Sequence, residues 1–401
     1  MSTVACVLVG TVVVIGGTQL LLYGPRDPAP FMTPIHLAGA RSYFLNADSR
    51  GFMDLAHHPA KILDPHSFRQ SRPGYVYASA ILTSVLGPAA QHIGLDRAFG
   101  EKDSAYFPLI LINAALVLAA AITLALLLRR LGAPPVVVAT LTLVLAVNDM
   151  TRLFFWTPHQ QMFVLVVPLA TIALGAWFIR ARPSPRLAAV VGLVIGVSSL
   201  AYGSVLIAIG VCSIILMARK NDRWTVLGAF WGGFLVPQVI WIAICKIVAG
   251  SYYSGEVSGY HEFVWPRYAA SDGIHALAAA FEANVVMTVR GFLAANGFLL
   301  LLLAMLIAIA VLSGVRLEPS TPDERGLLIA TGLTIGLSPL FAFGVGVGIW
   351  RVIYHVFPAV LLLIGWVSGK LVGSPVLRWR MAVLLVPVAG TALALHVITG
   401  A

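Results

Sequence analysis

The sequence predicts an all-α polytopic membrane protein with about 11 transmembrane helices. Of its 401 residues, 59% are hydrophobic and only 10% are charged. The charged residues fall in clusters, separated by apolar runs of about 20 residues, the length that an α-helix needs to cross the hydrocarbon core of a bilayer. This composition excludes the two or three soluble domains that the length alone would allow.

Eleven apolar runs are the candidate spans. The first, residues 4–23, has no basic segment before it and no small-residue cleavage site after it, so we expect a retained helix. Three others, beginning at residues 135, 187 and 204, are shorter than a bilayer core requires. After the first run, the spans are 106–128, 135–147, 162–179, 187–201, 204–217, 225–247, 292–315, 326–347, 352–369 and 381–398.

The basic residues predict the orientation of these spans. The short loops on one side carry thirteen Lys and Arg residues against four Asp and Glu residues, and such loops face the cytoplasm. We therefore expect an integral protein of the cell (inner) membrane with a cytoplasmic N-terminus and an extracytoplasmic C-terminus. The net charge of +10 reflects this topology. Because no basic block could follow a phosphate backbone, we expect no nucleic acid partner.

The chain is then a single integral-membrane domain, 1–401, with polar regions on its outer side. The largest are 24–104 and 249–291, and a short turn covers 148–161. The apolar segment 73–90 is not counted as a span, because doing so would move the basic pair Arg129 and Arg130 to the wrong side. We expect this segment to form a juxtamembrane or re-entrant helix.

The densest polar run begins at Arg41 and alternates aromatic with charged residues. The spacing of Tyr43, Asp48 and Phe52 predicts a short amphipathic helix whose carboxylate stays in water. Farther along, Arg69 and Arg72 are three residues apart and would share a helix face.

Four elements of the sequence form a pattern. An early acid is followed by a basic-Pro motif at the head of a juxtamembrane helix, by a span that ends in a basic pair and Leu-Gly, and by a late Arg/Tyr/Pro motif. These elements are Asp48, Arg72-Pro73-Gly74-Tyr75, Arg129-Arg130-Leu131-Gly132 and Arg351-Val-Ile-Tyr354-His355-Val-Phe-Pro358. The pattern resembles the GT-C-fold glycosyltransferases, which include protein O-mannosyltransferases and the aminoarabinose transferase of lipid A.

The resemblance implies a GT-C-like fold and transfer of a sugar from a polyprenyl-phosphate carrier to a glycan, lipid or protein acceptor at the outer membrane face. Such a reaction needs a carboxylate that accepts the acceptor's proton, and Asp48 is our candidate. It also needs a guanidinium for the leaving phosphate, and Arg351 is our first choice. Arg69, Arg72 and Tyr354 would assist it. The alternative for the arginines is simple anchoring at the membrane surface.

Other polar residues are secondary candidates for the acceptor site or for a second acid. In the short turn, Asp149 could pair with Asp48 around a divalent cation, and His159 lies nearby in sequence. The paired-acid motif of the family's metal-binding members is absent here, so the sequence specifies no metal ligand and leaves a divalent cation open. Asp54, His261 and Glu262 complete the candidates, although the last two are adjacent and would point to different faces.

Two other functions compete with glycosyl transfer. A lipid or sugar transporter or flippase usually places ionisable residues near mid-membrane and often has repeated halves. We find no mid-span acid and no internal repeat, which disfavours a transporter. An acyltransferase would need a His–Asp pair beside its acceptor, and His57 and His58 close to Asp54 leave that alternative open.

Overall fold

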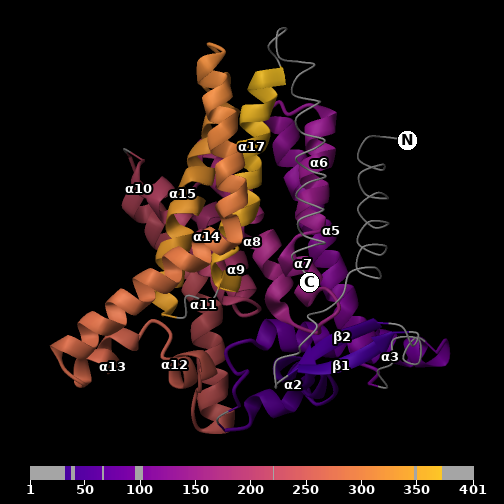
Figure 1. The fold of residues 1–401 in the computed structure, drawn as a ribbon. Helices are drawn as coiled ribbons and strands as arrows, with labels where there is room; N and C mark the ends of the chain where they lie inside the picture. The colour runs from indigo at the N-terminus through magenta and orange to yellow at the C-terminus, as the bar shows by residue number, and fades with distance from the viewer. Residues whose placement is uncertain are drawn as a thin grey trace.

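Helices build most of this protein, which we describe from a computed structural model (Figure 1). A membrane-embedded protein is supported by five helices that are long and apolar enough to cross a bilayer, together with four shorter apolar helices. The predicted first and last spans, 4–23 and 381–398, lie outside the described residues. The structure describes residues 32–37, 41–65, 67–94, 103–219, 221–346 and 350–372.

The nine predicted spans that fall within these ranges each coincide with helix. The five long segments are α5 (Tyr106–Arg130), α8 (Phe163–Ala181) with the preceding 3₁₀ turn η2 (Gln160–Met162), α11 (Arg223–Ala249), α14 (Ile274–Leu312) and α15 (Pro322–Val345). The shorter ones are α6 (Pro135–Ala146), α9 (Pro185–Ser199), α10 (Leu206–Met217) with η3 (Gly203–Val205), and α17 (Val356–Val372).

Local signals in the sequence set the ends of these helices. At the start of α15, the Thr321 hydroxyl accepts a hydrogen bond from the backbone N–H of Glu324, and Pro322 occupies the first turn. The same helix ends at Gly346, whose φ of 77° lies in the left-handed region that glycine adopts without strain. The boundaries therefore follow from capping residues as well as from hydropathy.

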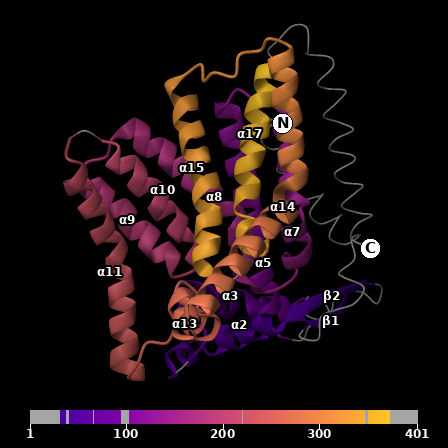
Figure 2. The same cartoon turned by 60° about the vertical axis from the view of Figure 1, so that its left-hand side comes forward.

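The bundle is organised around α8, which packs against α5, α10, α15 and α17. Beside this group, α9 and α11 form a closely packed pair that leans to one side of the molecule (Figure 2). The close approach of the pair depends on glycine: a Cβ at Gly233 would lie 2.0 Å from the carbonyl oxygen of Ala189, and one at Gly192 would lie 2.0 Å from that of Phe230. Larger residues would push the two backbones apart.

One helix is longer than the sequence predicted. The expected span began at residue 292, but α14 starts at Ile274 and runs for 39 residues. At 1.5 Å per residue this is ~58 Å, about twice the thickness of a bilayer core. Its first half is part of the predicted loop 249–291 and exposes Phe281 and Val289. Before it lie the short helices α12 (Gly255–Tyr260) and α13 (Trp265–Ser271).

The first polar region differs from the prediction at its start. The amphipathic helix expected from Arg41 is wrong for the first six residues, because Arg41–Asn46 forms strand β2 and pairs antiparallel with β1 (Met32–Leu37). The two strands pair along their inner edges, and they are the only strands in the described residues. Helix α2 then covers Ala47–His57 and buries Phe52 and Leu55 against α3.

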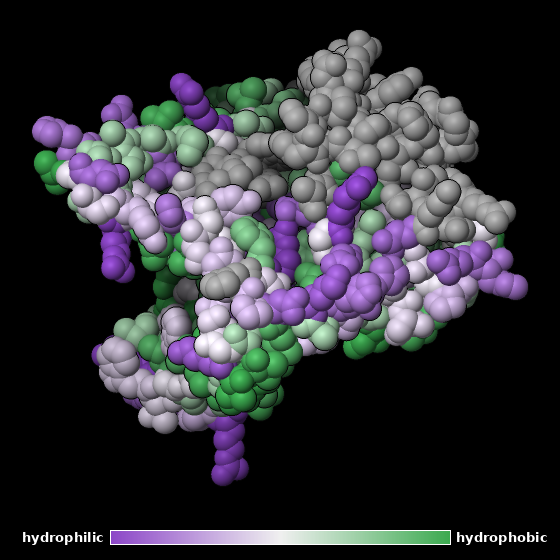
Figure 3. All heavy atoms as spheres, turned by 90° about the horizontal axis from the view of Figure 1, so that it is seen from below, coloured by the Kyte–Doolittle hydropathy of each residue, from purple (hydrophilic) through white to green (hydrophobic). Residues whose placement is uncertain are grey.

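The expected juxtamembrane segment is helical. Helix α3 (Pro73–His92) follows the 3₁₀ turn η1 (Pro59–Leu63) and exposes Ile81 and Val85. It lies at the same end of the bundle as α2, α12 and α13 (Figure 1). Seen from below, polar residues form a band across this end, with apolar residues along its border (Figure 3). The candidate site lies at this end.

Candidate active site

A cavity of about 250 Å³ brings together residues from the three regions that the sequence assigned to the outer side. The first region contributes Asp48, Arg69 and Arg72, and the short second region contributes His159. From the third region come Glu256 and Glu262. The ends of three apolar helices close the remaining wall. Their lining residues are Leu206 of α10, Phe341 and Val345 of α15, and Val352 of the short helix α16 (Trp350–Ile353).

Asp48 stands in the first turn of α2, where the helix dipole favours a negative charge. One carboxylate oxygen accepts a hydrogen bond from Arg69, and the other lies 3.3 Å from Nε2 of His159. Burial by itself would raise the pKa of Asp48, but the hydrogen bond from His159 and the charge of Arg69 outweigh it and hold the pKa well below its usual range. The group is therefore an ionised carboxylate at neutral pH.

The tautomer of His159 follows from its second hydrogen bond. The backbone N–H of Gln161 donates to Nδ1 of His159 at 3.0 Å, so in the neutral ring the proton sits on Nε2 and points to Asp48. The ring is only 4% exposed and packs against Phe52 and Phe154, with centroid separations of 5.9 and 5.5 Å. His159 thus fixes the carboxylate of Asp48 in one orientation.

The two arginines predicted to share a face both line the cavity. The Arg69 guanidinium lies 4.6 Å from the ring centroid of Phe52 and 5.0 Å from that of Phe68, in cation–π geometry. Arg72 lies against η3: a Cβ on Gly203 would be 2.8 Å from its Nη1. Each arginine is therefore held in place by shape as well as by charge.

Glu256 is a site residue that sequence reasoning missed. It is buried in α12, and its Oε1 lies 3.1 Å from Nε of Arg72. Its Oε2 accepts hydrogen bonds from Ser71 at 2.5 Å and from Ser254 at 3.2 Å. Burial raises the pKa of Glu256, but the charge of Arg72 and the Ser71 hydrogen bond lower it by more, so the net shift of this pKa is downward. In the sequence, Glu256 was marked as a possible site residue by one feature alone, its position as an acid among aromatic residues.

Aromatic and amide side chains complete the cavity wall. Tyr202 stacks between Phe163 and His355, at centroid distances of 5.5 and 5.9 Å. Its hydroxyl oxygen accepts a hydrogen bond from the side-chain amide of Gln161 at 3.4 Å. Phe68 meets Tyr260 edge to face at 5.7 Å. Aromatic faces next to polar groups suit a sugar ring, which has both apolar and hydroxylated surfaces.

The other predicted residues lie elsewhere or outside the described part. Asp54 pairs with Lys61 at 2.9 Å on the exposed side of α2, and His261 stacks on Tyr268 at 3.8 Å. Tyr354 is only 3% exposed and stacks on Phe357 within the hydrophobic core. The side chains of Asp149 and Arg351 lie outside the described part of the structure. Val352, the neighbour of Arg351, does line the cavity.

A histidine–aspartate pair of the kind an acyltransferase would need is found outside the cavity lining. His57 Nε2 lies 2.6 Å from Asp103 Oδ1, and the same oxygen accepts the backbone N–H of Ala105 at 2.8 Å. Asp103 therefore links the end of α2 to the start of α5, which is a structural role.

No group of three or more His, Cys, Asp and Glu side chains within the described ranges is arranged to hold a metal ion. Since the side chain of Asp149 is not among those that the structure describes, its pairing with Asp48 around a divalent cation stays a prediction. Comparison of the chain with family models, with curated proteins and with solved structures gave no match.

Proposed function

We propose that the protein is a GT-C-type glycosyltransferase with 11 spans that moves a sugar from a polyprenyl-phosphate carrier to an acceptor at the extracytoplasmic face of the cell membrane. The proposal rests above all on one observation: Asp48, Arg69, Arg72 and His159, from two separate polar regions, line one cavity at one end of an apolar helix bundle. Asp48 and Arg72 are also elements of the family resemblance.

The chemistry divides between the two kinds of charge. The acceptor hydroxyl oxygen forms a bond to the anomeric carbon while the bond from that carbon to the phosphate oxygen breaks, and the electron pair leaves with the phosphate. Asp48 accepts the hydroxyl proton, and guanidinium groups stabilise the phosphate that departs. Because the displacement is direct, the configuration at the anomeric carbon inverts.

The resting site must rearrange before it can react. A carboxylate whose pKa is held low by the hydrogen bond from His159 and by the charge of Arg69 is a weak base. A donor phosphate competes with Asp48 for the Arg69 guanidinium, and once it succeeds, the basicity of Asp48 rises. The carboxylate thus becomes an effective base when the donor is in place.

A further cation would help the cavity to hold an anionic donor. Among the side chains that the structure describes, three carboxylates, those of Asp48, Glu256 and Glu262, and two guanidiniums line the cavity. An anionic donor needs additional positive charge, for which Arg351 is the residue that we propose because it adjoins Val352 in the cavity wall. A divalent cation remains a further candidate for this role.

The transporter alternative is less well supported. Among the described candidate spans, the buried acid Glu324 lies in the first turn of α15, where it pairs with Lys370 at 2.7 Å. A coupled transporter would place such a residue near the middle of the bilayer.

The direct experiment incubates the purified full-length protein with a panel of polyprenyl-phosphate sugars and acceptors and follows donor consumption. Consumption that requires both an acceptor and Asp48 supports the proposal. The contrary result is movement of a labelled lipid across vesicle bilayers by the same protein while no donor in the panel is bound or consumed. That result would reject the glycosyltransferase proposal in favour of the transporter alternative.

A further inference from the structure

A second cavity, of about 760 Å³, lies at the other end of the helices that line the first. The first cavity lies at the η2 end of helix α8. The second cavity lies at the C-terminal end of the same helix, where it is lined by Phe178, Ile179 and Arg182. From Gln161 to Arg182 this is ~30 Å of helix, the thickness of a bilayer core. Helices α10 and α15 likewise contribute to both cavities from different turns.

The walls of the second cavity are apolar and its rim is polar. Ile215 and Leu333 belong to the walls, and Arg182, Arg219, Asn221 and Asp222 belong to the rim. Beside the cavity α8 and α15 pack closely, since a Cβ at Gly175 would lie 3.0 Å from the Cβ of Ala330.

The side of the cavity between α10 and α15 carries exposed apolar residues. Ile214 is 44% exposed and Ile329 is 46% exposed, and both line the cavity. On helices that cross a bilayer, such residues contact lipid tails. A ligand that enters here has an apolar part, which a free inorganic anion lacks.

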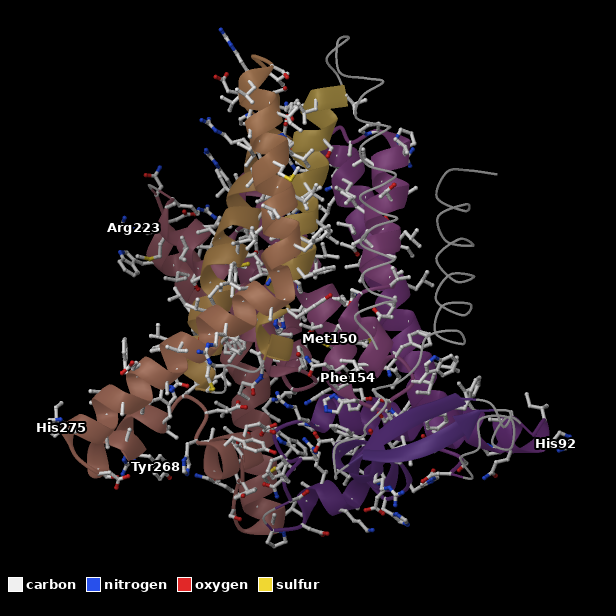
Figure 4. All side chains as sticks on the ribbon, viewed as in Figure 1. His92, Met150, Phe154, Arg223, Tyr268 and His275 are labelled. Atoms are coloured by element: carbon white, nitrogen blue, oxygen red, sulfur yellow. The ribbon has the colours of Figure 1, made fainter. Side chains whose placement is uncertain are left out.

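The two arginines of the rim differ in their partners. Arg219 donates to the carbonyl of Pro183 at 2.9 Å and pairs with Asp222 at 3.0 Å. Arg182 is exposed at the left-handed C-terminal end of α8, and none of the described carboxylates lies within ion-pair distance of it. Arg223 at the start of α11 adds positive charge to this end (Figure 4), whereas Arg180 is paired with Asp323 at 3.3 Å.

We propose that this cavity binds one anionic glycerophospholipid, with the phosphate at Arg182 and Arg219 and the upper part of an acyl chain along Ile215, Ile329 and Leu333. An anionic headgroup matches the basic rim, and the chain matches the apolar walls. The bound lipid would bridge α8, α10 and α15, the helices that also shape the first cavity. This site does not depend on the proposed glycosyl transfer.

The test is native mass spectrometry of the full-length protein in neutral detergent, titrated with dioleoyl phosphatidylglycerol or with dioleoyl phosphatidylcholine. We expect at least ten-fold tighter binding of one phosphatidylglycerol molecule. Arg182→Ala should remove most of this preference, and Arg182→Lys should keep it. The matched control is Arg129→Ala, which removes an arginine from another helix end. Ile329→Trp, which fills the cavity while leaving the rim intact, should block binding.

Equal binding of the two lipids would overturn the proposal, as would an unchanged preference in Arg182→Ala. Displacement of phosphatidylglycerol by an equal concentration of inorganic phosphate would also overturn it, because the site would then recognise the anion alone. If Arg182→Ala unfolds, the Ile329→Trp variant still tests the proposal, since it leaves every charged group in place. Unchanged phosphatidylglycerol binding by that variant would overturn the proposal.

Discussion

The imidazole of His159 donates from Nε2 to Oδ2 of Asp48 at 3.3 Å, joining side chains that are 111 residues apart in sequence. Its Nδ1 is already occupied by the Gln161 backbone, so the ring has one tautomer and one direction. The relationship gives the candidate base a fixed orientation before any substrate arrives.

Replacing Asp48 with Asn should reduce transfer by about 10²- to 10⁴-fold, because the amide cannot accept the proton. The Asn side chain still accepts a hydrogen bond, so the variant should fold and insert in the membrane. Initial rates with a labelled donor measure the effect. Asp54→Asn is the control, since Asp54 pairs with Lys61 on the exposed side of α2. Normal turnover in the Asp48 variant would reject the base assignment.

The acid stability of the protein should show the lowered pKa of Asp48. Because the folded protein holds this pKa below the ordinary value of 3.8, ionisation of Asp48 stabilises the fold above that value, and the stabilisation is lost as the pH falls below about 4. The difference in thermal stability between the native protein and Asp48→Asn should be constant from pH 8 to pH 5 and shrink below pH 4. A difference that stays the same below pH 4 would contradict the lowered pKa of Asp48.

Gly203→Ala should weaken donor use, because the new methyl group would lie 2.8 Å from Nη1 of Arg72 and displace the guanidinium. We expect the KM for the donor to rise about ten-fold, with a smaller effect on the acceptor. Gly228→Ala is the control, since a Cβ there has no neighbour within 4 Å. Equal losses for donor and acceptor would place Arg72 outside the donor site.

Arg351→Ala should raise the KM for the donor more than the KM for the acceptor, because the proposed role of this arginine is to bind phosphate. Steady-state kinetics with each substrate varied in turn measures both values. A variant that affects the two substrates alike would instead be explained by anchoring of Arg351 at the membrane surface.

The pairing of α9 with α11 offers a test of the fold itself. Gly233→Ala should destabilise the protein by about 1–3 kcal/mol, because its Cβ would meet the carbonyl oxygen of Ala189 at 2.0 Å. The adjacent Gly232→Ala has free space and should be neutral or stabilising by up to about 1 kcal/mol, as alanine is the better helix former. Thermal unfolding in detergent compares them, and equal effects would contradict this packing.

Hydropathy predicted the helices of the bundle well because each apolar run ends at a proline, a glycine or a charged cluster. It failed at residues 41–46, which pair as a strand with the preceding segment 32–37, and at residues 274–291, where a mixed sequence forms the first part of α14. The site was predictable in part: Asp48, Arg69, Arg72 and His159 stood out by residue type. Glu256 did not, because its contacts with Ser71 and Arg72 arise only when the third region folds onto the first.

The exposed apolar faces of α3 and of the first half of α14 have a consequence for substrate choice. His92 at the end of α3 and His275 near the start of α14 project from opposite sides of the same end of the molecule (Figure 4). The exposed side chains of Ile81 and Phe281 suit contact with a membrane surface, and with both in contact the bilayer would set the depth of the first cavity. The proposed glycosyltransferase would then select its carriers by the depth of their reactive bond in the membrane, and isoprenoid tails of different lengths should serve it equally well.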